Sequence, residues 1–598
     1  MKRNPVLILG NSPRFVVPIA RGLAARGIPV GVAALGPAPI IRSCSIQSFI
    51  HLPDVQGDSA GFLEAIRNHV RTNGFDMLVP TSDSALVAIL QHYDDLAGLL
   101  HIASPPPDVL RVALDKWRTL EAARNCNVPI PETHVLSSPD ELCRHMGDLH
   151  FPLIAKPGHK IEPQHSFKCQ YFREPTDLQS AFEASPDFGK DLIFQEYVAG
   201  EGVGLEILLH RGEPIMQFQH RRLKEFPSSG GVGILVISEK PDPVLADYAL
   251  KLLRHIAWEG VAMVEFRHDR NTGKSFLIEI NGRFWGSVAL SYHAGLNPGF
   301  YQWQIAHGDV PAPATYKVGV RARWTPGYVL RLHDLACHSR DENGGALRPP
   351  LGKDILNFFL DLQPFVRDMV WSIRDPLPAI TEMAQTARTL VMQDCRQLLR
   401  RTMPSGLRRT LRNARSLEPG PVRSAYIRMA LLRWLKIRRD VGRQIPSVAK
   451  RILFVCHGNI IRSPMAEALM KRFLEPRMQD GFWVSSAGLA AKSARKADER
   501  AVRVGRDFGV SLDRHRAVPL TSELVQASDV IFVMDCLNEA QILGRYRAAG
   551  HKTFLLGAYS GGSSRELEIP DPYLGGVSDI KACYELVARS VQNLVTQI

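Results

Sequence analysis

The sequence predicts a multi-domain α/β protein, in which α/β domains at the two ends of the chain flank a region of mixed α+β character. A length of 598 residues suits three or four domains. Residues 1–112 alternate short apolar strands with helical patterns, and residues 452–463 run from an apolar strand through a tight turn into a helix. A hydrophobic content of 45% is ample for buried cores.

Cysteine usage and the absence of a long apolar run indicate a cytoplasmic protein. The nine cysteines are scattered without a Cys-x-x-Cys pair, which fits a reducing compartment and argues against zinc sites or a disulfide framework. The apolar stretch near the N-terminus is too short for a secretory signal, and no run approaches the length needed to span a membrane.

Residues 1–112 are expected to form a small doubly wound α/β domain. Strands are predicted at 6–9, 30–33 and 77–80, with a helix over 19–26. The turn after the first strand contains one glycine, whereas a dinucleotide fingerprint requires three. This turn therefore predicts no cofactor by itself.

A group of oxygen-bearing side chains lies in the mixed region, residues 113–310. Glu279 and Asn281 are two positions apart in an apolar strand and so share one face of it. Glu265 belongs to the preceding strand, and Asn-Thr-Gly at 271–273 predicts the turn that pairs the two strands. Three convergent oxygens suit Mg²⁺ bound to nucleotide phosphates. A solvated face is the alternative interpretation, but these residues interrupt strongly apolar strands.

The same region contains side chains suited to a nucleotide. Lys156 ends a predicted strand, and Lys116 lies upstream of it. Residues 195–198 offer a strand edge whose backbone groups can bond an adenine, and Glu201 follows for a ribose. Arg283 lies two positions after Asn281, on the same face as Glu279 and Asn281, and can point at a phosphate. Taken singly, each is a weak indication, because a lone lysine is usually at the surface.

In this order, the residues resemble an ATP-grasp enzyme over about residues 1–310, with a pre-ATP-grasp domain at 1–112 and the ATP-grasp domain at 113–310. Such enzymes typically join a carboxylate to an amine or thiol through an acyl phosphate. The resemblance implies ATP and Mg²⁺ (or Mn²⁺) as cofactors, and a small-molecule carboxylate and amine as substrates. The implied contacts are ATP phosphates for Lys116 and Lys156, adenine for Gln195, Glu196, Tyr197 and Val198, ribose for Glu201, metal for Glu265, Glu279 and Asn281, and the acyl phosphate for Arg283.

One departure from this family concerns the loop after Lys156. It lacks the glycine-rich run that commonly covers the triphosphate. Nucleotide binding is therefore better supported than turnover. Two hypotheses stay open: a true ligase, or a non-catalytic nucleotide-binding sensor or scaffold for the C-terminal domain.

Residues 311–450 are expected to form a basic, largely helical linker. Residues 366–450 contain 18 Lys and Arg against 6 Asp and Glu, a net +12 that nearly equals the +13 of the whole chain. Between 422 and 443, apolar residues recur near helical spacing at Tyr426, Met429, Leu432 and Leu435. A basic helix of this kind suits peripheral contact with an anionic membrane. Packing of its apolar positions on the protein's own domains is the alternative, and no motif indicates nucleic-acid binding.

The most specific motif is a cysteine and an arginine six positions apart in a strand-to-helix turn, Cys456 and Arg462. Backbone N–H groups and a helix N-terminus form an anion site in such a turn. Arg462 can hold two phosphate oxygens, and the same positive environment favours Cys456 as a nucleophilic thiolate. The remaining positions of this phosphate loop are His457, Gly458, Asn459, Ile460, Ile461 and Ser463.

Asp571 is the predicted general acid. Transfer of a phosphoryl group to sulfur leaves an alkoxide or phenoxide that needs a proton. Asp571 lies between two prolines in a stiff loop, and Tyr573 offers a ring that can flank a flat substrate. A single cysteine is often a core residue and a single Asp-Pro a turn, but the strand, loop and helix context argues against both interpretations.

Residues 451–598 resemble a low molecular weight protein tyrosine phosphatase, an α/β domain with a central parallel sheet. Besides the phosphate loop, the similarity includes Ser-Ser-Ala-Gly at 485–488, His-Arg at 515–516, Val-Met-Asp at 533–535 and Asp-Pro-Tyr at 571–573. It implies a phosphocysteine on Cys456, a phosphate clamp at Arg462, and Asp571 as acid and then base. It also implies a phosphotyrosine protein as substrate, with an exopolysaccharide-related tyrosine kinase as the first target to test.

A departure from this second family lies inside the loop. Many members carry a second cysteine immediately before the arginine, where this chain has Ile461, so a protective disulfide within the loop is not available. Arsenate reductases use the same scaffold with additional cysteines. Cys536 lies in the appropriate region, but position 543 is leucine, so arsenate reduction is the weaker alternative.

Overall fold

The computed structural model describes residues 4–598 except 37, 161–168, 186–187, 228–229, 271, 338–350, 403–409, 411–412, 415–416, 418–419, 435–444, 447–448, 476–480, 562–566 and 574. The chain divides into two compact units, Met1–Asp394 and Cys395–Ile598. Among the described residues, no helix combines the length and the apolar character that a bilayer crossing requires.

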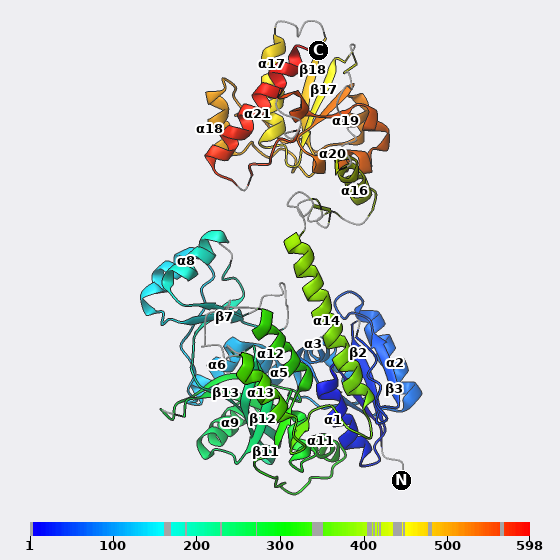
Figure 1. Cartoon of the computed structure of the whole chain (residues 1–598), viewed down its shortest axis with the longest axis vertical. Helices are drawn as coiled ribbons and strands as arrows, with labels where there is room; N and C mark the ends of the chain where they lie inside the picture. The colour runs from blue at the N-terminus through cyan, green and yellow to red at the C-terminus, as the bar shows by residue number, and fades with distance from the viewer. Residues whose placement is uncertain are drawn as a thin grey trace. The chain divides into compact units, whose positions relative to one another are not determined.

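The first unit begins with a five-stranded parallel sheet of order β3-β2-β1-β4-β5, flanked by helices (Figure 1). The strands are β1 (Val6–Leu9), β2 (Val30–Leu35), β3 (Ser48–Leu52), β4 (Met77–Pro80) and β5 (His101–Ile102), and the helices are α1 (Pro13–Ala24), α2 (Ser59–Asn73), α3 (Asp83–Gln91), α4 (Tyr93–Ala97), α5 (Pro107–Leu114) and α6 (Lys116–Asn125). The central strand β1 is fully buried, which explains its unbroken apolar run. Helix α1 starts well before the expected residue 19, because Pro13 has the fixed φ that suits a first helical turn.

A small antiparallel sheet of order β6-β9-β7-β8 follows and carries part of the candidate nucleotide site. Its strands are β6 (Thr133–His134), β7 (Leu153–Pro157), β8 (Gln170–Phe172) and β9 (Leu192–Glu196), and it is accompanied by α7 (Pro139–His145), the short helix η1 (Met146–Asp148) and α8 (Pro175–Ala184). The aromatic rings of Phe172, Phe182 and Phe194 form its core. This separate core positions the end of β7, and with it Lys156.

A seven-stranded sheet completes the first unit, in the order β14-β13-β10-β11-β12-β15-β16. The strands are β10 (Glu201–His210), β11 (Glu213–Phe226), β12 (Val232–Glu239), β13 (Gly260–His268), β14 (Ser275–Asn281), β15 (Arg321–Arg323) and β16 (Val366–Asp368), and the accompanying helices are α9 (Pro243–His255), α10 (Val288–His293) and α11 (Pro298–Ala306). All pairings are antiparallel except that of β15 with β16. Strands β13 and β14 form the hairpin expected around residues 271–273.

The region expected to be a linker from residue 311 onward differs from that expectation, because its first part belongs to the first unit. Strands β15 and β16 extend the large sheet, and α12 (Thr325–Cys337), α13 (Leu351–Asp361) and α14 (Leu377–Thr402) accompany them. The cause is apolar burial: Ala322 and Tyr328 are fully buried, and Val366 is 2% exposed. Net charge alone therefore did not mark the end of the folded unit.

The second unit contains a four-stranded parallel sheet of order β18-β17-β19-β20. Its strands are β17 (Arg451–Cys456), β18 (Trp483–Gly488), β19 (Val530–Val533) and β20 (Thr553–Leu555), and its helices are α16 (Pro421–Trp434), α17 (Arg462–Leu474), α18 (Glu499–Asp507), α19 (Ser522–Ala527), α20 (Cys536–Arg545) and α21 (Val577–Val595), with short helices η3 (Arg547–His551) and η4 (Leu556–Tyr559). Both faces of the parallel sheet are covered, as such sheets require.

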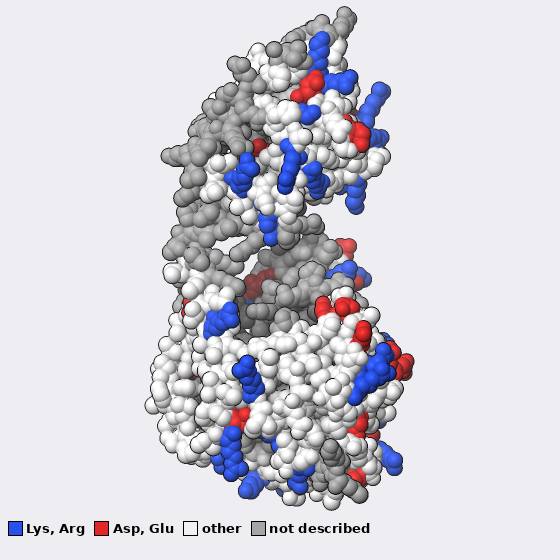
Figure 2. All heavy atoms as spheres, turned by 90° about the vertical axis from the view of Figure 1, so that its right-hand side faces the viewer, with Lys and Arg blue, Asp and Glu red and all other residues white. Residues whose placement is uncertain are grey.

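Helix α16 is the described part of the predicted basic helix, and it packs on the second unit. Tyr426 is 6% exposed and lies in a cluster with Cys536 and Ala540 of α20. Residues 435–443 lie outside the described residues. Figure 2 shows lysine and arginine side chains spread over the visible face of each unit, with acidic groups among them. In the described turns, burial of Tyr426 favours packing on the protein's own domain over membrane contact.

Candidate active sites

The phosphate loop connects the central strand of the second sheet to a buried helix. Cys456 is the last residue of β17, and α17 begins at Arg462. Asn459 between them has φ of 53°, a left-handed conformation that asparagine tolerates better than most residues. The strand, turn and helix therefore place the cysteine at the carboxyl edge of a parallel sheet, where α/β proteins bind ligands.

Two polar groups lie within hydrogen-bond distance of the sulfur of Cys456. The backbone N–H of Asn459 donates to Sγ at 3.2 Å, and the Ser463 Oγ lies 3.0 Å from it. The cysteine is only 3% exposed. An amide N–H and a hydroxyl at these distances can stabilise negative charge that develops on a buried sulfur.

The Asn459 side chain holds the loop together. Its amide nitrogen donates to Ser463 Oγ at 2.9 Å and to Ser486 Oγ at 2.8 Å, and its Oδ1 accepts from the Val518 amide at 2.9 Å. Ser486 Oγ in turn donates to Glu467 at 2.6 Å. Asn459 is fully buried, so each of these bonds replaces one that water supplied in the unfolded chain.

Arg462 is held between two carboxylates. Its Nη1 lies 2.6 Å from Asp535 Oδ2 and 3.1 Å from the Ile569 carbonyl oxygen, and its Nη2 lies 2.5 Å from Asp571 Oδ2. The arginine side chain is 2% exposed. Burial alone would lower the pKa of Arg462, but the charges of Asp535, Cys456 and Asp571 outweigh burial and raise it. The guanidinium is thus a permanent, oriented cation.

The structure brings together five of the predicted phosphatase residues. Hydrogen bonds join Cys456, Asn459 and Ser463, while Arg462 pairs with Asp571 and interacts with Cys456 through charge alone. The other four loop positions act through their backbone or the core. Ile460 and Ile461 are buried, and their carbonyls accept from the Asp498 amide and the Tyr584 hydroxyl. The His457 carbonyl accepts from the Ala490 amide, and a Cβ on Gly458 would meet nothing closer than 3.6 Å.

Sequence reasoning assigned no role to several residues that support this site. Asp535, Glu467, Ser486 and His515 all contact the loop, either directly or through one neighbour, His515 by a 2.8 Å contact with the Asn459 carbonyl oxygen. Asp535 follows Met534 just beyond the carboxyl end of an apolar strand. Functional residues of α/β proteins are common at this edge of the sheet. Ser486 and His515 lie in stretches that carry the family resemblance, without a role assigned to either, and Glu467 has no indication in the sequence.

The oxygen-bearing residues of the first unit share one face of the large sheet, as predicted. Glu265 lies directly opposite Glu279 in the β13–β14 pair, and Met263 lies opposite Asn281. The Asn281 amide donates to Glu279 Oε1 at 2.9 Å. These three oxygen donors are of the type that Mg²⁺ prefers.

Three lysines surround Glu279. Lys160 Nζ lies 3.5 Å from Glu279 Oε2 and 3.5 Å from Asn281 Oδ1, while Lys156 Nζ donates to Gln195 Oε1 at 2.6 Å. Burial, together with the charge of Lys116, lowers the pKa of Lys156 to about 8. Burial opposes ionisation of Glu279, but Lys160 and Lys116 hold its pKa well below the usual range. A partly buried cluster with excess positive charge fits an anion such as a polyphosphate.

Glu265 has its own counter-charge. Its Oε2 lies 2.5 Å from Arg222 Nη2, and Arg222 also contacts Glu225 at 3.2 Å and the Gly231 carbonyl at 2.9 Å. The two glutamates of the predicted metal set are therefore balanced by different cations, Arg222 and Lys160. A divalent ion between them would share these carboxylates with the two cations.

Several other residues predicted to contact the nucleotide form hydrogen bonds or ion pairs within the protein. The amides of Glu196 and Tyr197 donate to the Glu132 and Pro152 carbonyls, so an adenine at this edge would use other groups, such as the Val198 amide. Glu201, expected at a ribose, pairs instead with Arg221 and Arg270, at 3.1 and 2.7 Å.

Arg283, expected at an acyl phosphate, forms a two-pronged ion pair with Asp83 of α3 at 3.0 and 3.2 Å. The Asp83 carboxylate occupies the position that a phosphate would take on the guanidinium. Lys160 and Asp83 are residues that sequence reasoning missed. Lys160 lies four positions after Lys156, in the loop that follows β7, and Asp83 is the first residue of α3.

Comparison with known proteins finds a family match within each of the two units. Residues 451–598 match the model of the low molecular weight phosphotyrosine protein phosphatase family. The chain is 38% identical over 149 residues to the probable low molecular weight protein-tyrosine-phosphatase EpsP of Ralstonia nicotianae, covering 25% of this chain and 96% of the relative. The crystal structure of the Erwinia amylovora tyrosine phosphatase AmsI is 34% identical, with 25% of this chain and 93% of that chain covered and a TM-score of 0.23.

In the first unit, residues 188–327 match a family model described as ATP-grasp in the biosynthetic pathway with Ter operon. A biotin carboxylase structure from Campylobacter jejuni, in complex with an ATP analogue, covers 54% of this chain and 75% of that chain at 13% identity, with a TM-score of 0.44. The predicted pairing of an ATP-grasp domain with a C-terminal phosphatase domain is thereby confirmed.

Proposed function

The chain belongs to the low molecular weight phosphotyrosine protein phosphatase family through residues 451–598, and we propose that this domain hydrolyses protein phosphotyrosine through a phosphocysteine intermediate. The observation that supports this most is the environment of Cys456. Its sulfur accepts from the Asn459 amide, lies 3.0 Å from Ser463 Oγ, and shares the loop with the buried guanidinium of Arg462. A nucleophile and a phosphate clamp thus occupy one backbone cradle.

Each residue then has one task. A phosphoryl group takes the place of the Asp571 carboxylate on Arg462 Nη2, while Asp535 keeps the other arm of the guanidinium in position. The Cys456 sulfur forms a bond to phosphorus as the bond to the tyrosine oxygen breaks, and Asp571 gives that oxygen its proton. Asp571 next takes a proton from water, which attacks phosphorus and releases inorganic phosphate and the thiolate.

A phosphotyrosine protein is the proposed substrate, and an exopolysaccharide-related tyrosine kinase is the first target to test. The Tyr573 side chain beside Asp571 is 46% exposed, so a flat aromatic group can lie against it. Arsenate reduction is less favoured, because Cys536 lies in the small core with Tyr426 and burial raises the pKa of Cys583 to about 12. A buried thiol that stays protonated is a poor partner in a thiol relay.

Release of phosphate from an aryl phosphate tests the mechanism. Cys456→Ser should abolish turnover, and Asp571→Asn should slow substrates with a phenol leaving group by roughly 10²-fold or more. Mass spectrometry of acid-quenched wild-type reactions should detect phosphorus on the peptide that contains Cys456. Near-normal turnover in Cys456→Ser, with no phosphorylated peptide in the wild type, would overturn the proposal. A pull-down with full-length Cys456→Ser should then identify the phosphoprotein.

For the first unit, we propose Mg·ATP binding on the face that carries Glu265, Glu279 and Asn281, with ATP-dependent ligation of a carboxylate as the activity. The supporting observation is the lysine cluster, in which Lys116, Lys156 and Lys160 lie around the carboxylates of Glu279 and Asp83. The bound nucleotide would supply the activating phosphoryl group. Lys156 and Lys160 would hold its phosphates, and the three oxygen donors would hold the metal.

Two measurements separate ligase from non-catalytic sensor. Isothermal titration should give Mg·ATP binding that is lost in Glu279→Ala, and unchanged affinity in that variant would remove the metal assignment. ADP release that requires a carboxylate and an amine indicates a ligase. Binding without acceptor-dependent ADP release across a panel of acceptors indicates a sensor or scaffold for the phosphatase.

A further inference from the structure

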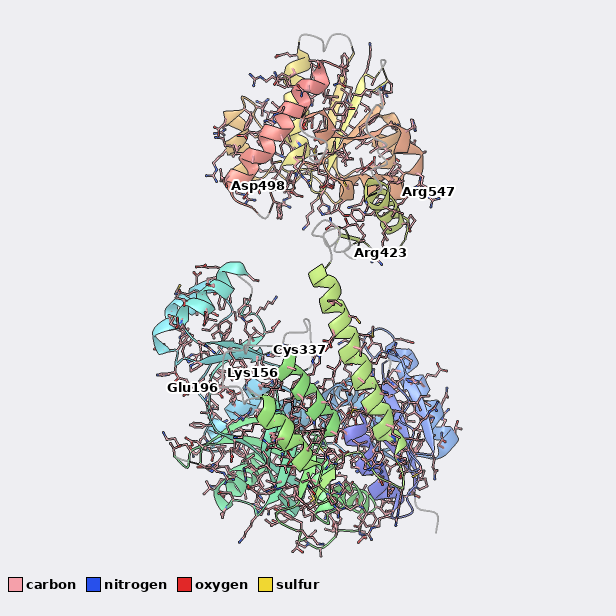
Figure 3. All side chains as sticks on the ribbon, in the orientation of Figure 1. Lys156, Glu196, Cys337, Arg423, Asp498 and Arg547 are labelled. Atoms are coloured by element: carbon pink, nitrogen blue, oxygen red, sulfur yellow. The ribbon has the colours of Figure 1, made fainter. Side chains whose placement is uncertain are left out.

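A cluster of three metal-binding side chains lies in the first unit, apart from both active sites. His333 and Cys337 are one turn apart on α12, and Asp394 belongs to α14. Their ligand atoms all lie within 4.8 Å of one another, and this is the only such His, Cys, Asp or Glu group among the described residues. Figure 3 labels Cys337 at the end of α12.

All the measured contacts of this cluster meet at one atom, Nε2 of His333. The two Asp394 carboxylate oxygens lie 3.0 and 3.1 Å from it, and the Cys337 sulfur lies 3.5 Å from it. A neutral imidazole nitrogen either donates one proton or accepts one, so it cannot act as donor to the carboxylate and as acceptor from the thiol at the same time. A single positive centre shared by all three groups would satisfy them together.

The separations from His333 Nε2 approach those of a tetrahedral zinc site, and the three ligand atoms all lie within 4.8 Å of one another. Zinc bonds of about 2.0–2.1 Å to nitrogen and oxygen and about 2.3 Å to sulfur place neighbouring ligand atoms roughly 3.3–3.5 Å apart. The observed 3.0–3.5 Å separations from Nε2 need only small rotations of exposed side chains to reach those values. We propose that His333, Cys337 and Asp394 bind a Zn²⁺ ion.

The ligand chemistry identifies the ion. A thiolate and an imidazole favour zinc over magnesium or calcium, which prefer oxygen donors. Binding forms the zinc–sulfur bond and releases the thiol proton of Cys337 to solvent. Three protein ligands leave a fourth position for water, and Cys337 and Asp394 are exposed, so the ion can exchange with solvent.

The site would fasten α12 to α14 near the end of the first unit. Asp394 is the last residue of that unit, and α14 continues beyond it to Thr402. A ligand that binds only the folded protein raises the free energy of unfolding. The increase grows with the logarithm of the ratio of ligand concentration to dissociation constant. Zinc should therefore hold α14 at Asp394 against α12.

The absence of a Cys-x-x-Cys pair had argued against zinc, because that inference considered only spacing along the sequence. Here one cysteine is joined by a histidine one helical turn before it and by an aspartate from a separate helix. The helical i, i+4 spacing puts the first two on one face. Only the packing of α14 against α12 supplies the third.

Zinc and cobalt titrations of the metal-stripped full chain test this proposal. All the proteins titrated carry Cys456→Ser, so that the cysteine of the phosphate loop does not compete for zinc. The buffer contains excess Mg²⁺ to occupy sites that have only oxygen ligands. We expect one tightly bound Zn²⁺ per chain, and cobalt should give a thiolate charge-transfer band. Both should disappear in Cys337→Ser, and affinity should fall by roughly 10²-fold or more in His333→Ala and Asp394→Asn.

Cys395→Ser is the matched control, since Cys395 is an exposed cysteine next to Asp394 but points in another direction on the helix. It should leave zinc affinity and the cobalt band unchanged. Zinc binding that survives Cys337→Ser, or falls equally in Cys395→Ser, would overturn the proposal, as would failure of the full chain to retain zinc. Circular dichroism confirms that each variant is folded, which is expected because the substituted groups lie at the surface.

Discussion

The Nη1 atom of Arg462 lies 2.6 Å from Oδ2 of Asp535, in a contact that leaves the second arm of the guanidinium for Asp571 or a phosphate. Asp535 thus positions the arginine without touching the nucleophile. Its Oδ1 accepts from the Asn538 amide at 2.8 Å, which caps α20. One carboxylate therefore links the helix terminus to the phosphate clamp.

Asp535→Asn should weaken the clamp while preserving the cap, because an amide oxygen can still accept from Asn538. A hydrogen bond to a charged group is worth about 1.5–3 kcal/mol, so kcat/KM for an aryl phosphate should fall roughly 10- to 150-fold. Steady-state kinetics measures this change, with Asp513→Asn, at an exposed Arg506 pair, as the control. An unaltered kcat/KM in Asp535→Asn would mean that Arg462 needs no such support.

Substitution of Asn459 should separate backbone strain from hydrogen bonding. Asn459→Gly removes the side-chain bonds to Ser463, Ser486 and Val518 but tolerates φ of 53°, whereas Asn459→Ala removes the same bonds and adds strain. Both should lower phosphatase activity by more than about tenfold, and Ala should be less stable than Gly by about 1 kcal/mol. Thermal unfolding and kinetics measure the two effects. Equal stability of the two variants would rule out strain at this position.

The phosphate loop could be predicted from sequence because its parts are contiguous. Cys456, Asn459, Arg462 and Ser463 lie within one strand, turn and helix, where local geometry determines which groups face the same point. Asp571 followed from a chemical requirement for an acid. Asp535 and Ser486 were not assigned, because their contacts depend on which strands lie beside β17, and strand order is a property of the whole sheet.

In the first unit, the Glu265, Glu279 and Asn281 set followed from strand periodicity and one hairpin. Lys160 and Asp83 did not, because Lys160 approaches the same face from the loop after β7 and Asp83 from the first turn of α3. The end of this unit was also missed: charge counting made residues 311–394 part of a linker, whereas β15 and β16 pair with the large sheet. Short strands in a basic segment carry too little apolar periodicity to be recognised.

We expect the protein to take up a proton when it binds nucleotide at alkaline pH. In the free protein the pKa of Lys156 is lowered to about 8, so near pH 8.5 much of it is neutral. A bound polyphosphate favours the ammonium form and raises that pKa, so affinity should be highest below pH 8 and decline as pH rises above it. Calorimetric titration at pH 8.5 in buffers of different ionisation enthalpy should give an uptake of up to one proton.

Lys156→Met provides the matched comparison for this effect. The variant keeps a long side chain but cannot titrate, so its binding should be weaker at pH 7 and accompanied by much less proton uptake at pH 8.5. The lowered pKa of Lys116 makes a smaller residual uptake expected. Equal proton uptake in wild type and variant would assign the effect to another group.

The carboxyl group of Glu382 should make the first unit less stable as pH rises from about 5 to 8. Burial raises its pKa from 4.5 to about 7, although the Trp324 Nε1–H donates to it at 3.1 Å and Arg14 attracts it. Between these pH values the folded state therefore retains a proton that the unfolded chain releases. The free energy of unfolding falls as pH rises until pH exceeds the pKa of Glu382 in the folded state. Glu382→Gln cannot ionise and keeps an acceptor for Trp324. It should be more stable than wild type by roughly 1–3 kcal/mol at pH 8, with little difference at pH 5.

Differential scanning calorimetry of the full chain measures this difference, and the transition that Mg·ATP shifts identifies the first unit. Glu64→Gln, at an exposed position of α2, is the control and should show no pH-dependent gain. Equal gains at pH 5 and pH 8 in Glu382→Gln would show that packing rather than ionisation stabilises the variant. A gain in stability confined to pH 8 would identify ionisation of the buried Glu382 carboxyl group as the cause. Glutamine cannot ionise, and no other residue differs between the two proteins.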